Sequence, residues 1–299
     1  MSKGIIFIAI GENWRQEAIL AASKVKQFIP GIPITVFTDC FFSSPVFDEV
    51  RVAQPGLNPL LTKTLWMSQS PYEQTLFLDT DILLCDNIDD VFMLLDRFDL
   101  AVPHAPYRLT DMGLSIPLPD FLESGVPSCF PGMNTGMILF RRTQKVEAFL
   151  NTWGEFHLKL CAISPKAPNQ PAFRTALYHS DLRFAIIPEE YHCRFIYPFK
   201  VCGKVKVLHG RHPDMELVIE RINQKQLPRV GEGYFVELSK QNQQRLKPKT
   251  EGVKTWKWSG LFSNFLKPHS EEKDLKRNNA NIPVLPPEGI PNGGTITLI

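Results

Sequence analysis

The chain has 299 residues, of which 43% are hydrophobic and 21% are charged, the composition of an ordinary soluble globular protein. Its 33 lysines and arginines nearly balance its 31 aspartates and glutamates, which argues against a nucleic-acid-binding protein with a large basic excess. No run of about 18 consecutive apolar residues predicts a membrane-spanning helix. The six cysteines form no C-x-x-C pair, which argues against a zinc knuckle and favours a reducing, cytoplasmic compartment.

The first 105 residues alternate predicted strands with predicted helices. The apolar stretch at 4–10 predicts a strand, and apolar residues at helical spacing predict a helix over 14–29. The same reasoning predicts strands over 34–39, 48–54, 74–81 and 99–105 and helices over 59–71 and 88–98. This alternation predicts an α/β fold whose mostly parallel sheet is flanked by helices on both faces.

The rest of the chain is less regular and begins with a proline-containing stretch at 105–133. A loop of this length inside a compact domain often binds a ligand. Beyond it we expect strands over 134–142, 182–195 and 204–212 and helices over 144–160 and 169–180. We therefore expect a single domain over 1–266, and the charged, Asn-, Pro- and Gly-rich residues 267–299 predict a flexible tail.

Just before the predicted tail, residues 254–267 combine aromatic and aliphatic side chains with three lysines. Residues 254–266 fit a final helix that caps the core. A helix of this composition also fits a membrane surface, where it would make a peripheral contact with the inner face of the membrane. The sequence leaves both alternatives open.

Two aspartates, Asp79 and Asp81, directly follow the buried-strand pattern "TLFL". Buried carboxylates are costly unless they are paired or bind a cation. Ligands bind open α/β sheets beyond the carboxyl ends of the strands, and residues two apart in an extended chain share a face. Both carboxylates can therefore meet one Mg²⁺ or Mn²⁺ ion, which prefers oxygen ligands and bridges readily to a diphosphate.

Two other interpretations of this D-x-D pair are open. Many acidic pairs lie on a protein surface and bind nothing. Haloacid-dehalogenase-type phosphatases also place D-x-D after an apolar strand and use the first aspartate as nucleophile. They carry the pair near the start of the domain and follow it with Gly-Thr or Thr-Val, whereas here 78 residues precede it and "ILL" follows.

Around this pair, the sequence "LTKTLWMSQSPYEQTLFLDTDILL" resembles the GT-A glycosyltransferases, most closely glycosyltransferase family 8, the glycogenin and bacterial galactosyltransferase group. Four blocks carry the resemblance, in order, across roughly residues 4–212. They are "FIAIGENWRQEAILAASKVKQFIPGIPITVFTD", Lys63 with the D-x-D pair, "MNTGMILFRR", and "NQPAF" followed by "VLHG". The resemblance implies a single Rossmann-like domain that transfers a sugar from a nucleotide diphosphate donor.

The resemblance also implies a divalent metal site. Asp79, Asp81 and His209 would hold Mn²⁺ or Mg²⁺, and the imidazole would bind through a neutral ring nitrogen. Asp79 would also contact the donor ribose. The alternative for His209 is a lone histidine at the end of a strand.

Further residues would bind the donor, which the resemblance implies is a UDP-sugar. The first β–α turn would hold the base through the backbone near Ala9, Ile10 and Gly11, and Trp14 would either stack on the base or pack in the core. Lys63 would contact the sugar or a phosphate, unless it is a solvated surface lysine. The remaining implied donor contacts are Asn134, Gly136, which allows a close approach, Gly210 and Arg211.

The chain departs from the family at the position of the cation that would hold the diphosphate. The family continues after the histidine as Gly-x-x-Lys-Pro-Trp, whereas this chain reads "HGRHPDME". Arg211 or His212 would take the cationic role here, since arginine binds phosphate well.

Asn169 and Gln170 are catalytic candidates, at a position where the family usually has Asp-Gln. An amide cannot act as nucleophile or base, so Asn169 could not attack the sugar, while Gln170 would support the reacting sugar. Retention by a front-face route, in which the leaving diphosphate takes the acceptor's proton, needs no protein nucleophile. Direct displacement by an acceptor that a carboxylate base activates stays open, with Asp111, Asp120 and Glu123 as candidate bases.

The sequence therefore predicts a metal-dependent, retaining glycosyltransferase that moves a sugar from a nucleotide-sugar donor to a hydroxyl acceptor. The alternative is a nucleotide-sugar-binding domain of the same fold with weak or no activity. Asn169 and the altered sequence after His209 favour that alternative.

Overall fold

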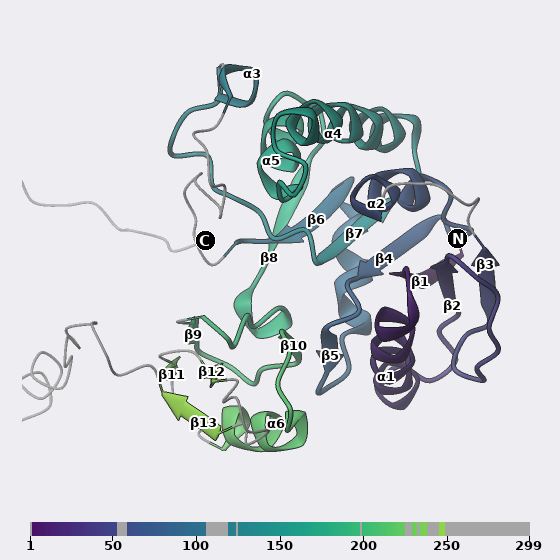
Figure 1. Ribbon diagram of the computed structural model, residues 1–299, viewed down its shortest axis with the longest axis vertical. Coiled ribbons are helices and arrows are strands. Elements are labelled where there is room, and N and C mark those ends of the chain that lie inside the picture. The colour runs from purple at the N-terminus through teal and green to yellow at the C-terminus, as the bar shows by residue number, and fades with distance from the viewer. Residues whose placement is uncertain are drawn as a thin grey trace, which may run out of the picture. The chain divides into compact units, whose positions relative to one another are not determined.

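A seven-stranded mixed sheet forms the centre of the computed structural model (Figure 1). In spatial order its strands are β3 (Glu49–Val52), β2 (Ile34–Thr38), β1 (Lys3–Ala9), β4 (Gln74–Leu78), β7 (Met137–Arg141), β6 (Leu100–Pro103) and β8 (Phe184–Ile187). The strand pairs are parallel except for β4–β7 and β6–β7. The predicted α/β fold with a mostly parallel sheet is confirmed.

The structure describes residues 2–52, 59–105, 119–123, 125–197, 199–224, 229–231, 234–237 and 245–248. The chain divides into two units after Thr250, and all of these residues belong to the first unit. The predicted helix at 254–267, the predicted boundary at 266 and the predicted tail at 267–299 lie outside the described residues. So do most of the predicted loop at 105–133 and Asp111 within it.

Helices lie on both sides of the central sheet (Figure 1), and side chains of the central strands pack toward both. In β1, Ile5 and Phe7 pack into one hydrophobic cluster, and Ile6 packs into another. Helix α1 (Glu12–Phe28) and the 3₁₀ helix η1 (Asp89–Asp96) cover the first cluster, and helices α2 (Pro59–Ser68), α4 (Gln144–Ile163) and α5 (Gln170–Tyr178) cover the second. Burial on both faces explains why the central strands are apolar without alternation.

A short antiparallel ladder joins two distant parts of the chain below the main sheet. Strand β5 (Ile82–Leu84) pairs with β10 (Val207–His209), and His209 lies opposite Ile82. The remaining elements are α3 (Asp120–Glu123), η2 (Glu189–Tyr191), β9 (Phe199–Val201), α6 (Met215–Asn223), β11 (Arg229–Gly231), β12 (Tyr234–Glu237) and β13 (Arg245–Pro248). A third hydrophobic cluster, which includes Phe199, Leu208 and Val218, packs β9, β10 and α6 together.

Several predicted elements are shorter than expected. The strand predicted over 74–81 ends at Leu78, because the backbone N–H of Ile82 donates to the carbonyl of Asp79 at 3.2 Å and closes a turn. The strand predicted over 182–195 ends at Ile187, because Pro188 has no N–H to continue a ladder. The helix predicted over 88–98 is the 3₁₀ helix η1, and the strand predicted over 204–212 is reduced to β10.

Within the part of the chain that the structure describes, each helix is too short or too polar to span a lipid bilayer. The expected cytoplasmic location and the expected membrane-surface contact stay predictions.

Candidate functional site

The two aspartates of the D-x-D pair lie in the turn between β4 and β5. The backbone N–H of Asp79 donates to the carbonyl of Gly136 on one side, at 2.7 Å. On the other side the N–H of Gly210 donates to the carbonyl of Asp81, at 3.0 Å. Both ends of the turn are therefore held by segments far away in the sequence. The sequence argument that placed the carboxylates on one face of an extended strand was wrong, because a turn brings them together instead.

Asp79, Asp81 and His209 meet at this turn, with one ligand atom from each residue within 4.8 Å of the others. Nε2 of His209 lies 3.3 Å from Oδ1 of Asp81. The β5–β10 ladder produces this contact, because it sets His209 opposite Ile82, the residue next to Asp81. Two carboxylates and one imidazole fit Mn²⁺ or Mg²⁺, which bind oxygen ligands and accept a nitrogen ligand.

Lys63 reaches the first aspartate from α2. Its Nζ lies 2.8 Å from Oδ1 of Asp79 and donates to the carbonyl of Thr135 at 3.0 Å. The ammonium also lies 4.6 Å from the centre of the Phe77 ring. With a side chain only 14% exposed, Lys63 is not the solvated surface lysine of the alternative interpretation.

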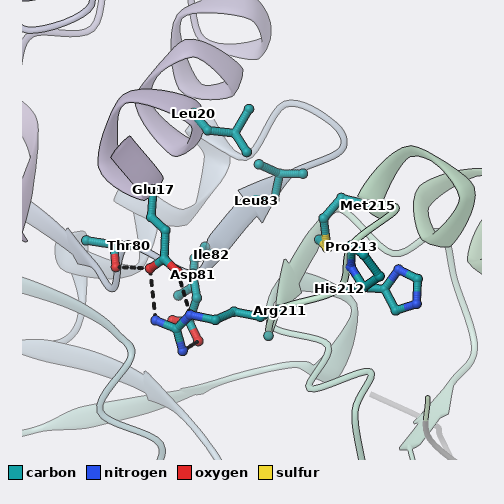
Figure 2. A pocket seen from close by; sticks show the side chains of 11 residues that line it. Glu17, Leu20, Thr80, Asp81, Ile82, Leu83, Arg211, His212, Pro213 and Met215 are labelled. Carbon is teal, nitrogen blue, oxygen red and sulfur yellow. Dashed lines mark hydrogen bonds and ion pairs between the residues drawn. The ribbon is translucent and has the colours of Figure 1, made fainter. Parts of the chain in front are cut away.

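Arg211 holds the second aspartate and a glutamate that the sequence analysis missed (Figure 2). Its Nη1 lies 3.1 Å from Oδ2 of Asp81, and its Nε and Nη2 donate to the two carboxylate oxygens of Glu17 at 2.5 and 2.9 Å. The hydroxyl of Thr80 also donates to Glu17, at 2.8 Å. The guanidinium is thus committed to two carboxylates in this structure.

The protonation of Asp81 and His209 follows from their burial and their neighbours. Burial alone would raise the pKa of Asp81, but the contact with His209 and the charges of Arg211 and Arg194 outweigh it and hold this pKa below its usual range. Burial lowers the pKa of His209, although Asp81 opposes the shift. At neutral pH the carboxylate is therefore ionised and the imidazole is neutral, the two forms that bind a metal.

A second buried histidine, His192, lies behind His209. Its Nε2 is 2.7 Å from Nδ1 of His209, and its Nδ1 is buried with no hydrogen-bond partner among the described residues. Burial also lowers the pKa of His192 well below its usual value. A metal-binding nitrogen carries no proton, so Nδ1–H of His209 would donate to His192 when Nε2 faces a metal. No local sequence pattern indicates this residue.

Gly136 creates the space that His209 occupies. A Cβ atom at residue 136 would lie 2.3 Å from Cε1 of His209 and 3.0 Å from Oδ1 of Asn134. Gly136 therefore admits the close approach of side chains of the protein, and its expected contact with the donor stays a prediction.

A cavity of about 480 Å³ opens at Asp79, Asp81 and His209, the candidate metal-ligand cluster. Most of the predicted site residues line it: Ile10, Trp14, Lys63, Asp79, Asp81, Asn134, Asn169, Gln170, His209 and Arg211. Arg194, which the sequence analysis missed, lines it as well. We call this space the first cavity.

Three of the predicted residues that line the first cavity lie just before β7 or at the start of α5: Asn134, Asn169 and Gln170. Oδ1 of Asn134 accepts the N–H of Gly136 at 2.8 Å, and Oδ1 of Asn169 accepts the hydroxyl of Thr135 at 2.7 Å. Asn169 directly precedes α5, which begins at Gln170. The two amides of residues 134 and 169 are thus positioned by neighbouring backbone and hydroxyl groups.

The first β–α turn also contributes to the first cavity, through Ile10 and Trp14. Gly11 has φ of 89°, a conformation that favours glycine, and its N–H donates to Asp39 at 3.0 Å. Trp14 is 51% exposed, so its ring is not packed in the core and can stack on a planar ligand. Ala9 is completely buried within β1, so its side chain does not face the first cavity.

A second cavity of about 510 Å³ adjoins the first and shares Thr80, Asp81 and Arg211 with it (Figure 2). Its other walls are mainly apolar and include Leu20, Leu83 and Met215. Two of the expected donor residues, Gly210 and His212, line this second cavity and not the first.

The remaining base candidates lie away from both cavities. Asp120 and Glu123 are exposed on α3, and neither lines the first or the second cavity.

Comparisons with known proteins identify the fold. The chain matches neither a protein-family model nor a curated protein. It matches the solved structure of galactosyltransferase LgtC in complex with donor and acceptor sugar analogues, with 13% identity and a TM-score of 0.51 over 70% of this chain and 87% of LgtC. It also matches apo mouse xyloside xylosyltransferase 1, with 12% identity and a TM-score of 0.47 over 71% of this chain and 98% of that one. The likeness to LgtC shows a shared α/β, Rossmann-like fold.

Proposed function

We propose that this chain is a metal-dependent glycosyltransferase that moves a sugar from a nucleotide diphosphate donor, a UDP-sugar, to a hydroxyl acceptor. The observation that carries the proposal is the cluster of Asp79, Asp81 and His209, with ligand atoms within 4.8 Å of one another at the carboxyl end of β4. Ligands of open α/β sheets bind at this edge. The shared fold with LgtC agrees with this placement.

The residues around the first cavity can be assigned to the base, the ribose, the phosphates and the sugar of such a donor. The exposed indole of Trp14 and the adjacent backbone of Ile10 would bind the base. Asp79 would contact the ribose as well as the metal, and Lys63, already placed beside it, would contact the sugar or a phosphate. Asn134 would hydrogen-bond to sugar or acceptor hydroxyls.

Asp79, Asp81 and His209 would hold Mn²⁺ or Mg²⁺, and such an ion would supply Lewis-acid stabilisation of the charge on the leaving diphosphate. The protein's own contribution is to keep the carboxylate of Asp81 ionised and the imidazole of His209 neutral, the forms that bind a metal. Lys63 and Arg211 balance the two negative charges while the carboxylates bind no metal.

We propose retention of configuration because of the residues beside the donor sugar. Asn169 and Gln170 line the first cavity and carry amides, which can hydrogen-bond to a sugar but cannot attack it. A front-face route, in which the leaving diphosphate accepts the proton of the acceptor hydroxyl, uses neither residue as a nucleophile.

The decisive experiment compares Asp81→Asn with the unaltered chain by calorimetric titration with MnCl₂ and UDP. We expect Mn²⁺ affinity to fall by more than about tenfold, since even residues behind a metal ligand contribute about 10- to 100-fold. Asp96→Asn is the matched control, because Asp96 is exposed on η1 and lines neither cavity. Equal Mn²⁺ affinity in Asp81→Asn and the unaltered chain would refute the proposal.

A binding domain without turnover is the second candidate, and the amide of Asn169 favours it. A donor-hydrolysis assay on the unaltered chain separates the two candidates. Metal-dependent UDP binding with no hydrolysis of UDP-sugars and no transfer would support the binding domain. Turnover of a simple phosphate ester, abolished by Asp79→Asn, would support the phosphatase alternative instead.

A further inference from the structure

Three strongly basic side chains line the first cavity, and two of them are already paired. Lys63 contacts Asp79, and Arg211 contacts Glu17 and Asp81. The guanidinium of Arg194 makes no hydrogen bond or ion pair with any residue that the structure describes, and its Nε is buried without a partner. A buried N–H that lacks an acceptor is costly, so this group points to an anion that the cavity would receive.

The backbone holds Arg194 beside the metal-ligand cluster. The N–H of Cys193 donates to the carbonyl of Val207, and the N–H of His209 donates to the carbonyl of Cys193, both at 2.9 Å. The guanidinium carbon lies 5.3 Å from the centre of the Tyr197 ring, which supports its flat face. The charge of Arg194 also acts on Asp81 and His209. Arg194 is thus a fixed cation next to the place where the proposed diphosphate would lie.

We propose that Arg194 binds the diphosphate of the donor. This inference rests on the proposed function and assigns the cationic role to Arg194, where the sequence analysis favoured Arg211 or His212. Arg211 is held by two carboxylates, and Nδ1 of His212 lies 2.8 Å from the backbone carbonyl of Asp214, outside the first cavity. A guanidinium can donate two parallel hydrogen bonds, from Nε and one Nη, to phosphate oxygens.

The test is calorimetric titration of Arg194→Gln with UDP and with uridine, both in saturating MnCl₂. UDP carries the diphosphate and uridine does not. Loss of a residue that binds the diphosphate should therefore weaken the binding of UDP and not that of uridine. We expect UDP affinity to fall by about tenfold or more while uridine affinity stays within about twofold, as loss of a charge-assisted pair predicts. Arg97→Ala, an exposed arginine outside both cavities, should leave both affinities unchanged.

Thermal melting of each variant checks that it folds. Should Arg194→Gln fail to fold, Arg194→Lys replaces it, because lysine keeps the positive charge but lacks the two parallel N–H donors of the guanidinium. This variant should lose part of the UDP affinity and none of the uridine affinity. Equal losses for UDP and uridine, or no loss for UDP, would overturn the role of Arg194 while leaving the proposed function intact. Failure of the unaltered chain to bind UDP would instead overturn the proposed function, and the role of Arg194 with it.

Discussion

At the scale of single residues, the position of His209 depends on the absence of a side chain at residue 136. We expect Gly136→Ala to displace the imidazole, because the added Cβ would lie 2.3 Å from its Cε1. Mn²⁺ affinity should fall, and the free energy of unfolding should decrease by about 1–3 kcal/mol, as for other overpacked sites. Calorimetry and urea denaturation measure the two effects.

Gly203→Ala is the matched control for this substitution. A Cβ at Gly203 would meet only Cγ of Glu190, at 3.5 Å, and Oε1 of Glu190, at 3.9 Å, which are ordinary contacts. A Gly136→Ala variant that bound Mn²⁺ as tightly as Gly203→Ala would show that the site tolerates the extra atom and that His209 is not constrained there.

His192 gives a second prediction at this scale. Its Nε2 is the only described partner for Nδ1 of His209, at 2.7 Å, so we expect it to orient the metal-binding ring. His192→Ala should weaken Mn²⁺ binding by about 10- to 100-fold, the usual effect of removing a residue behind a metal ligand. His192→Gln, whose amide oxygen can accept the same hydrogen bond, should restore part of the affinity. Equal Mn²⁺ affinity in His192→Ala and the unaltered chain would contradict this role.

Residue type and spacing were enough to single out Asp79 and Asp81, because the pair directly follows a buried-strand pattern, whereas His209 was implied by the family resemblance. The same reasoning could not find Glu17, His192 or Arg194. Glu17 is one polar residue on the surface of a helix, and its partner Arg211 is 194 residues away. No pattern within a short window connects such residues.

At the scale of secondary-structure elements, the packing of α4 against α5 positions Asn169. Trp153 is completely buried, its Nε1 donates to the carbonyl of Asn169 at 3.0 Å, and its ring meets Phe173 edge-on at 4.9 Å. Trp153→Phe should cost about 1 kcal/mol of stability for the lost hydrogen bond, and Trp153→Ala about 3–5 kcal/mol for the lost packing. Urea denaturation measures both.

Leu158→Ala provides the comparison for this element, because Leu158 lies on α4 and is 50% exposed. It should change the free energy of unfolding by less than about 0.5 kcal/mol. If Trp153→Phe changed the free energy of unfolding as little as Leu158→Ala does, the hydrogen bond to Asn169 would have no part in holding α5.

Most elements were predictable from the sequence, because an apolar strand and an amphipathic helix carry their own periodicity. Their ends were less predictable. The apolar run before Asp79 favoured a strand that continues to Asp81, yet the chain turns there. The two ends of the turn are held by backbone hydrogen bonds, from the N–H of Asp79 to the carbonyl of Gly136 and from the N–H of Gly210 to the carbonyl of Asp81. No residue near position 80 indicates these distant partners.

At the scale of the whole molecule, burial of two neutral histidines predicts how stability depends on pH. The pKa values of His192 and His209 are lowered by burial, whereas in the unfolded chain both would titrate near 6.5. Above that pH the folded and unfolded states bind the same number of protons at these two rings, and the free energy of unfolding is not reduced by them. Below it only the unfolded state binds them, so stability falls by up to about 1.4 kcal/mol per pH unit for each histidine.

Urea denaturation in EDTA, between about pH 7.5 and about pH 5.5, checks this prediction. We expect a progressive loss of stability as the pH falls and a smaller loss in His192→Gln, which lacks one of the two groups. Stability that stayed constant or rose toward pH 5.5 would show that the buried rings accept protons in the folded state.

The sequence by itself determined the class of fold, the existence of the central strands and helices, and the residue types of a candidate metal site, because these depend on local periodicity and side-chain chemistry. Only the tertiary structure decided that β10 pairs with β5 and brings His209 to Asp81, and that Gly136 leaves room for the imidazole. It also decided that Arg211 is already paired, while the guanidinium of Arg194 has no partner among the described residues. The physical reason is that contacts between residues far apart in the sequence depend on strand pairing and close packing, which short sequence patterns do not encode.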